Sequence, residues 1–120
     1  MKTIRINRAK WLRGAGVDLD GVFVPNYLWC PDRQAGCCLG HAIHQTAKCS
    51  WKDLAGKSIP ESYYRKNSFL TDLRTDGTAN NWFADDAMSI NDATNISEEK
   101  REKRLTELFA ENNIKLEFYN

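Results

Sequence analysis

Apolar and polar residues alternate at both ends of the chain. Near the N-terminus a polar residue separates Ile4 from Ile6, and near the C-terminus Ile114, Leu116 and Phe118 follow the same period. A period of two is typical of a β-strand that buries one face. We therefore expect both chain ends to form short strands that pair in one small sheet.

The strongest helical pattern directly precedes the C-terminal strand. Leu105, Leu108 and Phe109 follow an i, i+3, i+4 spacing, which gathers them on one face of a helix. Asn95 or Ser97 is expected to cap this helix, because their side-chain oxygens accept backbone hydrogen bonds at a helix N-terminus. Glutamates in the first turn match its positive end.

Shorter helices are expected in the rest of the chain. Asn7 is predicted to cap a brief helix that continues to Leu12, and Gly14 ends it. The other predicted helices cover 37–48, 50–54 and 85–90, and the last of these ends at Asn91-Asp92.

Two segments contain the residue types that favour turns and loops. Residues 14–31 are rich in Gly, Asp, Pro and Asn, which predicts a long loop with a short strand at 22–24. Asp76-Gly77 is a tight-turn dipeptide. We expect it to join a hairpin between the residues around 69–70 and 82–83.

These elements predict an α+β fold. The chain has 120 residues, of which 42% are hydrophobic, so it has room for one modest core. We expect residues 1–120 to form a single compact domain, with a small sheet that includes both terminal strands and about three helices packed on it.

Charge and hydropathy narrow the classes of partner. Seventeen basic and sixteen acidic residues give a net charge of +1, which lacks the signal of a general nucleic-acid or membrane-surface binder. No apolar run approaches the ~20 residues of a membrane span, and no signal peptide is recognisable. We therefore expect a cytoplasmic protein with reduced thiols, no membrane contact and no nucleic-acid partner.

All four cysteines and both histidines lie between residues 30 and 49. On a helix that begins near Cys37, the side chains of Cys37, His41 and His44 form one stripe, and Cys30 or Cys49 would complete a tetrahedral zinc site. The paired ligand spacing of familiar zinc modules is missing, however, and free cysteines are commonly buried. We favour a packed helix with no metal and no cofactor, and zinc binding is the alternative.

A cysteine nucleophile is a second alternative for the same segment. Cys38 at a helix N-terminus would have a lowered pKa, and His41 or His44 lies one turn along the helix. A catalytic base usually comes from another part of the fold, and the chain has no further histidine. We therefore predict that the protein is not an enzyme.

Two groups of charged residues are expected to be solvent-exposed. Asp85, Asp86 and Asp92 have the chemistry for divalent-metal or acid–base work, but a solvated helix face followed by an Asn-Asp turn is the favoured interpretation. The run at 100–104 mixes Lys, Arg and Glu, which predicts a solvated face with i, i+4 ion pairs.

Aromatic and basic residues supply the candidate binding site. Four tryptophans are many for a domain of this size, and one or two exposed beside a tyrosine would anchor a protein partner or stack on a ligand. A basic cluster of Arg5, Arg8, Lys10 and Arg13 surrounds Trp11 in the sequence. The predicted binding residues are Trp11, Arg13, Trp29, Trp51, Tyr63, Tyr64 and Trp82.

Three short motifs follow one another along the chain. They are Trp11-Leu12-Arg13-Gly14, the tetrad Cys37-Cys38-Leu39-Gly40, and Ala87-Met88-Ser89-Ile90-Asn91-Asp92 before a charged helix. In this order the chain resembles a group of small phage and prophage proteins of unassigned function. It departs from that pattern after Gly40, where His41 and His44 replace an apolar stretch.

The resemblance implies a phage accessory protein, a class in which blocking host defence or metabolism is common. On physical grounds the two thiols and the glycine suit close backbone packing, and Asn-Asp suits a turn, so both motifs are expected to be scaffold. We expect a non-catalytic protein that binds and inhibits a host factor, with a defence component as one class of target. A sponge for a nucleotide-like signal is the alternative, and a zinc-binding or nucleic-acid-binding module ranks lower.

Overall fold

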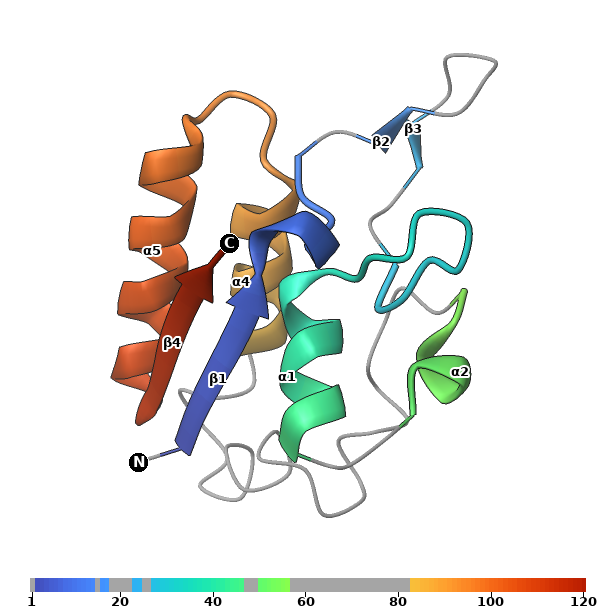
Figure 1. Cartoon of the computed structure of the whole chain (residues 1–120). Helices are drawn as coiled ribbons and strands as arrows, with labels where there is room; N and C mark the ends of the chain where they lie inside the picture. Colours follow the sequence, from blue (N-terminus) through green and yellow to red (C-terminus); the bar gives the residue numbers. More distant parts are fainter. Residues whose placement is uncertain (1, 15, 18–22, 25–26, 47–49, 57–82) are drawn as a thin grey trace.

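The two ends of the chain form the central sheet. The computed structural model describes residues 2–14, 16–17, 23–24, 27–46, 50–56 and 83–120. Strand β1 (Lys2–Asn7) pairs in parallel with β4 (Ile114–Tyr119), from Lys2 opposite Ile114 to Asn7 opposite Tyr119. The two arrows lie side by side with the same direction in Figure 1. The prediction that both ends pair in one small sheet is confirmed.

Three helices lie on one face of this sheet. Helices α4 (Phe83–Asp92) and α5 (Glu98–Glu111) stand behind the two strands in Figure 1, and α1 (Cys38–Thr46) stands beside β1. The buried strand residues join one core cluster with the buried faces of these helices. The α+β class is therefore confirmed, whereas the extension of a single domain over all of 1–120 stays a prediction. No helix among the described residues is long and apolar enough to cross a bilayer.

Helix α5 agrees with its sequence pattern. The Ser97 side chain accepts a hydrogen bond from the backbone N–H of Lys100 at 3.1 Å, so Ser97 is the N-cap. Leu105 and Phe109 are fully buried, and Leu108 packs against the core from its edge. The i, i+3, i+4 stripe faces the core as predicted.

The charged run at 100–104 contains one exception to the predicted solvated face. The Arg101 side chain is buried, and its Nη1 donates to the carbonyl oxygens of Ile90 at 2.9 Å and Asn91 at 2.8 Å. These carbonyls belong to the last turn of α4, where a helix has unpaired acceptors and a partial negative charge. The prediction was wrong at Arg101, because its guanidinium is buried where it hydrogen-bonds the C-terminal carbonyls of α4.

The helix predicted from Asn7 to Leu12 is shorter than expected. Asn7 caps a 3-10 helix, η1 (Arg8–Lys10), by accepting from the N–H of Ala9 at 3.0 Å. The chain then leaves the helix at Trp11, because the Leu12 N–H donates to the carbonyl oxygen of Gly36 and the Gly36 N–H donates to that of Lys10. A partner far along the sequence thus replaces the second helical turn.

The loop predicted at 14–31 contains a small hairpin. Strand β2 (Gly16–Val17) pairs in antiparallel with β3 (Phe23–Val24). The predicted strand at 22–24 is confirmed at residues 23–24, and β2 was not predicted. Helix α1 confirms the helix expected at 37–48 as far as Thr46, and α2 (Trp51–Leu54) confirms the turn at 50–54 with Ser50 as its cap.

The hairpin predicted around Asp76-Gly77 lies almost wholly outside the described residues. Phe83 is described, and it begins α4 instead of ending a strand, so the prediction was wrong at this residue. Its ring is buried and lies 5.0 Å from that of Phe109, which fixes the start of α4 against α5. Helix α4 therefore includes the helix expected at 85–90 and continues through Asn91 and Asp92.

Two glycines, Gly36 before α1 and Gly40 in its first turn, allow the backbone to lie directly against another segment. A Cβ atom at Gly36 or at Gly40 would overlap the carbonyl oxygen of Leu28. Cys37 and Cys38 between them are fully buried. The predicted role of the tetrad Cys37-Cys38-Leu39-Gly40 in close backbone packing is confirmed.

The free edge of β1 is covered by a side chain. The Gln45 amide of α1 donates from Nε2 to the carbonyl oxygen of Arg5 at 2.6 Å and accepts the Arg5 N–H on Oε1 at 2.9 Å. A primary amide has one donor and one acceptor side, so it imitates a neighbouring strand. This pairing blunts an edge that would otherwise invite another strand.

Candidate functional site

The three sequence motifs meet at the side chain of Asn91. Its Oδ1 accepts from the Trp11 indole Nε1 at 2.8 Å and from the backbone N–H of Cys38 at 3.1 Å, and its Nδ2 donates to the carbonyl oxygen of Leu12 at 3.0 Å. Asn91 is fully buried. The residues that carry the resemblance therefore form one internal junction between the Trp11 segment, α1 and α4.

The buried thiols beside this junction are unsuited to nucleophilic chemistry. Burial raises the pKa of Cys37 to about 12 and raises that of Cys38 well above its ordinary value. The Cys38 thiol lies 3.9 Å from the carbonyl oxygen of Ala87. A neutral, enclosed thiol is a poor nucleophile. The alternative of a Cys38 thiolate with a lowered pKa is therefore wrong.

The imidazole of His41 has a structural partner. Its Nε2 lies 2.8 Å from the carbonyl oxygen of Lys10, so the neutral ring donates there. Burial lowers the pKa of His41, which favours this neutral form. His44 stacks on the Trp51 ring with centroids 4.0 Å apart. His41 thus holds the backbone beside the junction, and His44 takes part in an aromatic stack.

The stripe Cys37, His41 and His44 does not converge on a common point. Among the described residues, no three His, Cys, Asp or Glu side chains form a group that could hold a metal ion. Cys49 lies outside those residues. The expected absence of metal stays a prediction.

The tryptophans that the structure describes contribute mainly to packing. Trp11 and Trp29 are 4% and 7% exposed, and Trp29 stacks on the half-buried Trp51 at 4.2 Å. The Trp11 ring contacts Phe118 at 4.6 Å. Trp11 and Trp29 therefore have no freely exposed ring for a partner. Three further predicted binding residues, Tyr63, Tyr64 and Trp82, lie outside the described residues.

Two arginines of the basic cluster near Trp11, Arg8 and Arg13, are matched by carboxylates of α5. Arg13 covers the Trp11 ring at 4.5 Å, and its Nε donates to Glu98 at 2.7 Å. Arg8 makes two hydrogen bonds of 2.8 Å to Glu102. These pairs tie the N-terminal segment to α5 and reduce the positive charge available to a nucleic acid.

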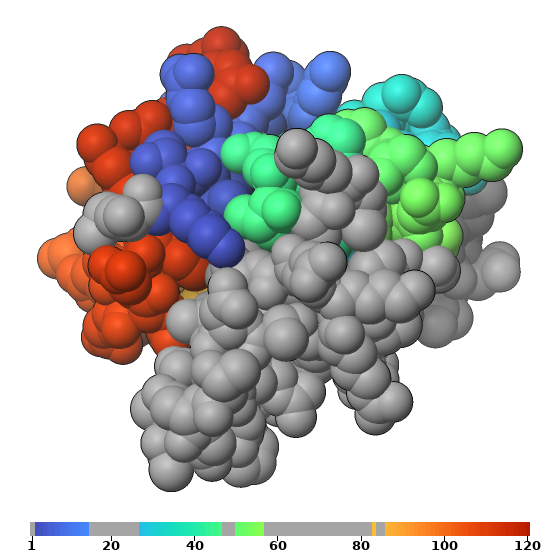
Figure 2. All heavy atoms as spheres, turned by 90° about the horizontal axis from the view of Figure 1, so that it is seen from below, coloured from blue at the N-terminus to red at the C-terminus, as the bar shows by residue number. Residues whose placement is uncertain are grey.

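The outer face of the sheet forms the first candidate site, which we name the sheet face: Arg5, Lys115, Glu117 and Tyr119. Arg5 and Lys115 lie 3.4 Å and 3.1 Å from the Glu117 carboxylate, and the Arg5 guanidinium lies 4.9 Å from the centre of the Tyr119 ring. At 41% exposure, Tyr119 is the large hydrophobic side chain that the described part of the chain leaves exposed. Seen from below, atoms of β1 reach the surface between α1 and the segment of α5 and β4 (Figure 2).

Sequence reasoning missed the sheet face although its signal was present. The alternation that turns Ile114 and Leu116 inward places Lys115, Glu117 and Tyr119 on the opposite side. The contribution of Arg5 required the parallel register, which sets Arg5 opposite Glu117. Strand orientation could not be obtained from the alternation.

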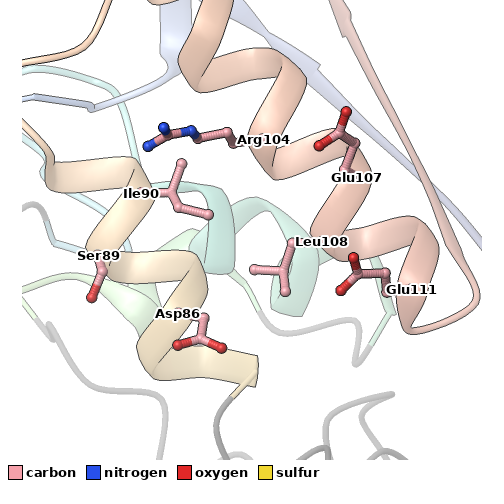
Figure 3. A pocket seen from close by; sticks show the side chains of 7 residues that line it. All are labelled: Asp86, Ser89, Ile90, Arg104, Glu107, Leu108 and Glu111. Atoms are coloured by element: carbon pink, nitrogen blue, oxygen red, sulfur yellow. The ribbon is translucent and has the colours of Figure 1, made fainter.

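An open groove between α4 and α5 forms the second candidate site. Its volume is about 340 Å³, and Ile90 and Leu108 supply its apolar part. Figure 3 shows these two side chains between the helices, with Arg104 toward one end and Asp86 and Glu111 toward the other. The complete lining is Asp86, Ser89, Ile90, Arg104, Glu107, Leu108 and Glu111. Asp86 is exposed, as the interpretation of a solvated helix face predicted.

Comparison with known proteins gave no match: the chain matches no family model, no curated protein and no solved structure. The geometry of the two candidate sites is thus the basis for the functional argument.

Proposed function

We propose that this chain is a non-catalytic, phage-type accessory protein that binds a host protein through the sheet face and inhibits it in a one-to-one complex. Components of host defence are the first class of target to test. The observation that carries the proposal is the exposed Tyr119 ring beside the Arg5 guanidinium on a paired strand. Tyr and Arg are enriched among residues that dominate binding energy at protein interfaces.

The sheet face is preorganised. Arg5 and Tyr119 lie on strands whose backbones are paired along their whole length, and Glu117 holds the Arg5 side chain by an ion pair. Side chains that are already ordered lose little conformational entropy when a partner binds. The face carries two cations and one carboxylate, so we expect an acidic surface on the target.

The described surface favours a protein partner over a nucleotide-like ligand. A sponge for such a ligand needs aromatic rings in a concave pocket, whereas the residues that line the α4–α5 groove include no aromatic side chain. The exposed ring of Tyr119 lies on a sheet face instead. These two features support the binder as the primary hypothesis.

Site-specific photo-crosslinking tests the proposal. A photoreactive phenylalanine analogue at position 119 is expected to capture one host protein in cells, and the same analogue at the exposed Lys52 of α2 should not. The captured protein, once purified, should bind the wild-type chain one to one by calorimetry. Tyr119→Ala should weaken binding by about tenfold or more, as for a central interface residue, whereas Lys52→Ala should leave it unchanged.

Two results would contradict the proposal. One is identical capture from positions 119 and 52. The other is unchanged affinity in a variant that combines Arg5→Ala with Tyr119→Ala. A small molecule that co-purifies and is seen by native mass spectrometry would instead favour the sponge.

A further inference from the structure

We infer that the α4–α5 groove is a self-association surface, which receives α5 of a second copy packed antiparallel to its own α5. This inference is independent of the proposed host target, because it uses a different face of the molecule. Its evidence is the charge pattern of α5, the apolar centre of the groove and the exposure of the lining residues.

The exposed face of α5 is cationic in its first half and anionic in its second. At about 100° per residue, Lys100, Arg104, Glu107, Leu108 and Glu111 fall within one arc of about 100°. The four charged residues are exposed, and Leu108 is half-buried at the edge of the core. Cations therefore precede carboxylates along a single strip of the surface.

This order of charges is self-complementary in an antiparallel pair. If a twofold axis places Arg104 of one copy opposite Glu107 of the other, that axis passes between residues 105 and 106 of both α5 helices. The same axis brings Lys100 to Glu111. One symmetric arrangement thus matches both cations with both carboxylates, and each pair occurs twice in an isologous dimer.

The groove supplies the contact that charges alone would not. Ile90 and Leu108 offer an apolar centre, against which Leu108 of the second copy and the methylene groups of its Arg104 side chain would pack. Ser89 is the smallest residue of the α4 wall and lets a helix approach. Three carboxylates line the groove, namely Asp86, Glu107 and Glu111, so the occupant should be a helix with basic and apolar residues. The exposed strip of α5 presents such residues in Lys100, Arg104 and Leu108, beside its own two carboxylates.

Sedimentation of the full chain tests the inference. The wild type is expected to form a concentration-dependent dimer with a dissociation constant of roughly 1–100 µM, because one helix pair buries less surface than a standard interface. Salt should weaken the dimer, since its pairs lie near the rim. Arg104→Glu or Glu107→Arg alone should weaken it by about tenfold, because two symmetry-related attractions become repulsions.

The charge-swapped double variant gives the sharpest result. Arg104→Glu combined with Glu107→Arg exchanges the two signs and should restore dimerisation close to the wild-type affinity. The matched control is Lys103→Glu, which reverses an exposed charge of α5 that does not line the groove and should leave the dimer unchanged. Thermal melts of all variants should agree closely, which shows that the fold is retained.

Three outcomes would overturn the inference. A wild type that stays monomeric up to about 1 mM lacks the dimer altogether. A dimer that survives either single reversal does not use this surface. A double variant that fails to recover, while a synthetic basic amphipathic helix binds the groove, would assign the groove to a foreign partner. Tyr119→Ala should not affect the dimer, so the host-binding proposal and this one can fail separately.

Discussion

The junction around Asn91 and the two outer surfaces differ in the kind of residues that build them. The junction consists of uncommon residues, namely a tryptophan, adjacent cysteines and a buried asparagine, and all are enclosed. The sheet face and the α4–α5 groove consist largely of charged residues that stand in ordinary alternating or helical patterns. The most distinctive residues of this sequence therefore hold the fold together and are not exposed to a partner, because tight packing restricts which residue types fit.

The two regions should therefore respond differently to substitution. A change at the junction disturbs buried hydrogen bonds or backbone contact and should lower the free energy of unfolding. A change at either surface should alter association and leave unfolding almost unchanged. The following predictions test this division, beginning with the largest expected effect.

Gly40→Ala should be strongly destabilising. In an exposed helix, alanine in place of glycine would stabilise the protein by about 1 kcal/mol. Here the added Cβ would overlap the carbonyl oxygen of Leu28, so α1 and that segment must separate. We expect a loss of about 3–5 kcal/mol in urea unfolding, in the range of severe core defects. Lys103→Ala on exposed α5 is the control and should change stability by less than about 0.5 kcal/mol. Equal stability of both variants would contradict the close packing.

Asn91→Ala should be the next most damaging change. It removes the acceptor of the Trp11 indole and the Cys38 N–H and the donor to the Leu12 carbonyl. Buried polar groups without partners are destabilising by about 1–3 kcal/mol each, so we expect a loss of about 3 kcal/mol or more by denaturant titration. Asn95→Ala, at an exposed asparagine before α5, is the matched control. A loss no larger than that of the control would show that the junction adds little stability.

His41 should make the stability of the fold depend on pH. Burial lowers its pKa below the ordinary value of 6.5. The unfolded chain therefore binds a proton more readily than the folded protein, so the stability contribution is full above pH 6.5 and falls as the pH drops from 6.5 toward the folded-state pKa. Urea midpoints measured between pH 8 and pH 5 should show this decrease. His41→Gln keeps a donor for the Lys10 carbonyl and should reduce the decrease. An unaltered pH profile in that variant would assign the effect to another group.

The thiols allow a chemical test of the same enclosure. Cys37 and Cys38 are fully buried with raised pKa values, whereas Cys30 is partly exposed. A thiol-directed alkylating reagent at neutral pH should therefore modify Cys30 in the folded protein and reach Cys37 and Cys38 only after denaturation. Mass spectrometry of the peptides would show this order. Rapid native modification of Cys38 would mean that the junction opens.

Local periodicity predicted the elements that depend on local signals. The terminal strands and α5 follow apolar spacing that a strand or a helix must have to bury one face. Elements that depend on distant partners could not be predicted in this way. Trp11 leaves its expected helix because Gly36 pairs with the backbone beside it, and Phe83 joins α4 while its ring packs on Phe109. Arg101 is buried because another helix ends beside it.

The candidate sites likewise divide into residues that a local pattern predicts and residues that depend on a distant segment. The outward positions of Lys115, Glu117 and Tyr119 are contained in the alternation of β4, so three of the four residues of the sheet face could be predicted. Its partner Arg5 required the parallel register. The groove required α4 and α5 to lie side by side, a relation between two segments that neither segment encodes alone. Composition drew attention to the tryptophans instead, although Trp11 and Trp29 are enclosed.

The smallest effect on stability is expected at the sheet face. Arg5 and Tyr119 are exposed, and their ring contact should contribute only about 0.5–1 kcal/mol. The ion pair of Arg5 with Glu117 should add at most about 1 kcal/mol, because solvent screens it. Tyr119→Ala should therefore lower the free energy of unfolding by no more than about 1 kcal/mol, and Arg5→Ala, which removes both contacts, by no more than about 2 kcal/mol. A double-mutant cycle should give a coupling of about 0.5 kcal/mol. Their effect should instead appear in host-protein affinity. A loss of more than about 2 kcal/mol from Tyr119→Ala would place this ring in the scaffold and remove the distinction between the enclosed junction and the sheet face.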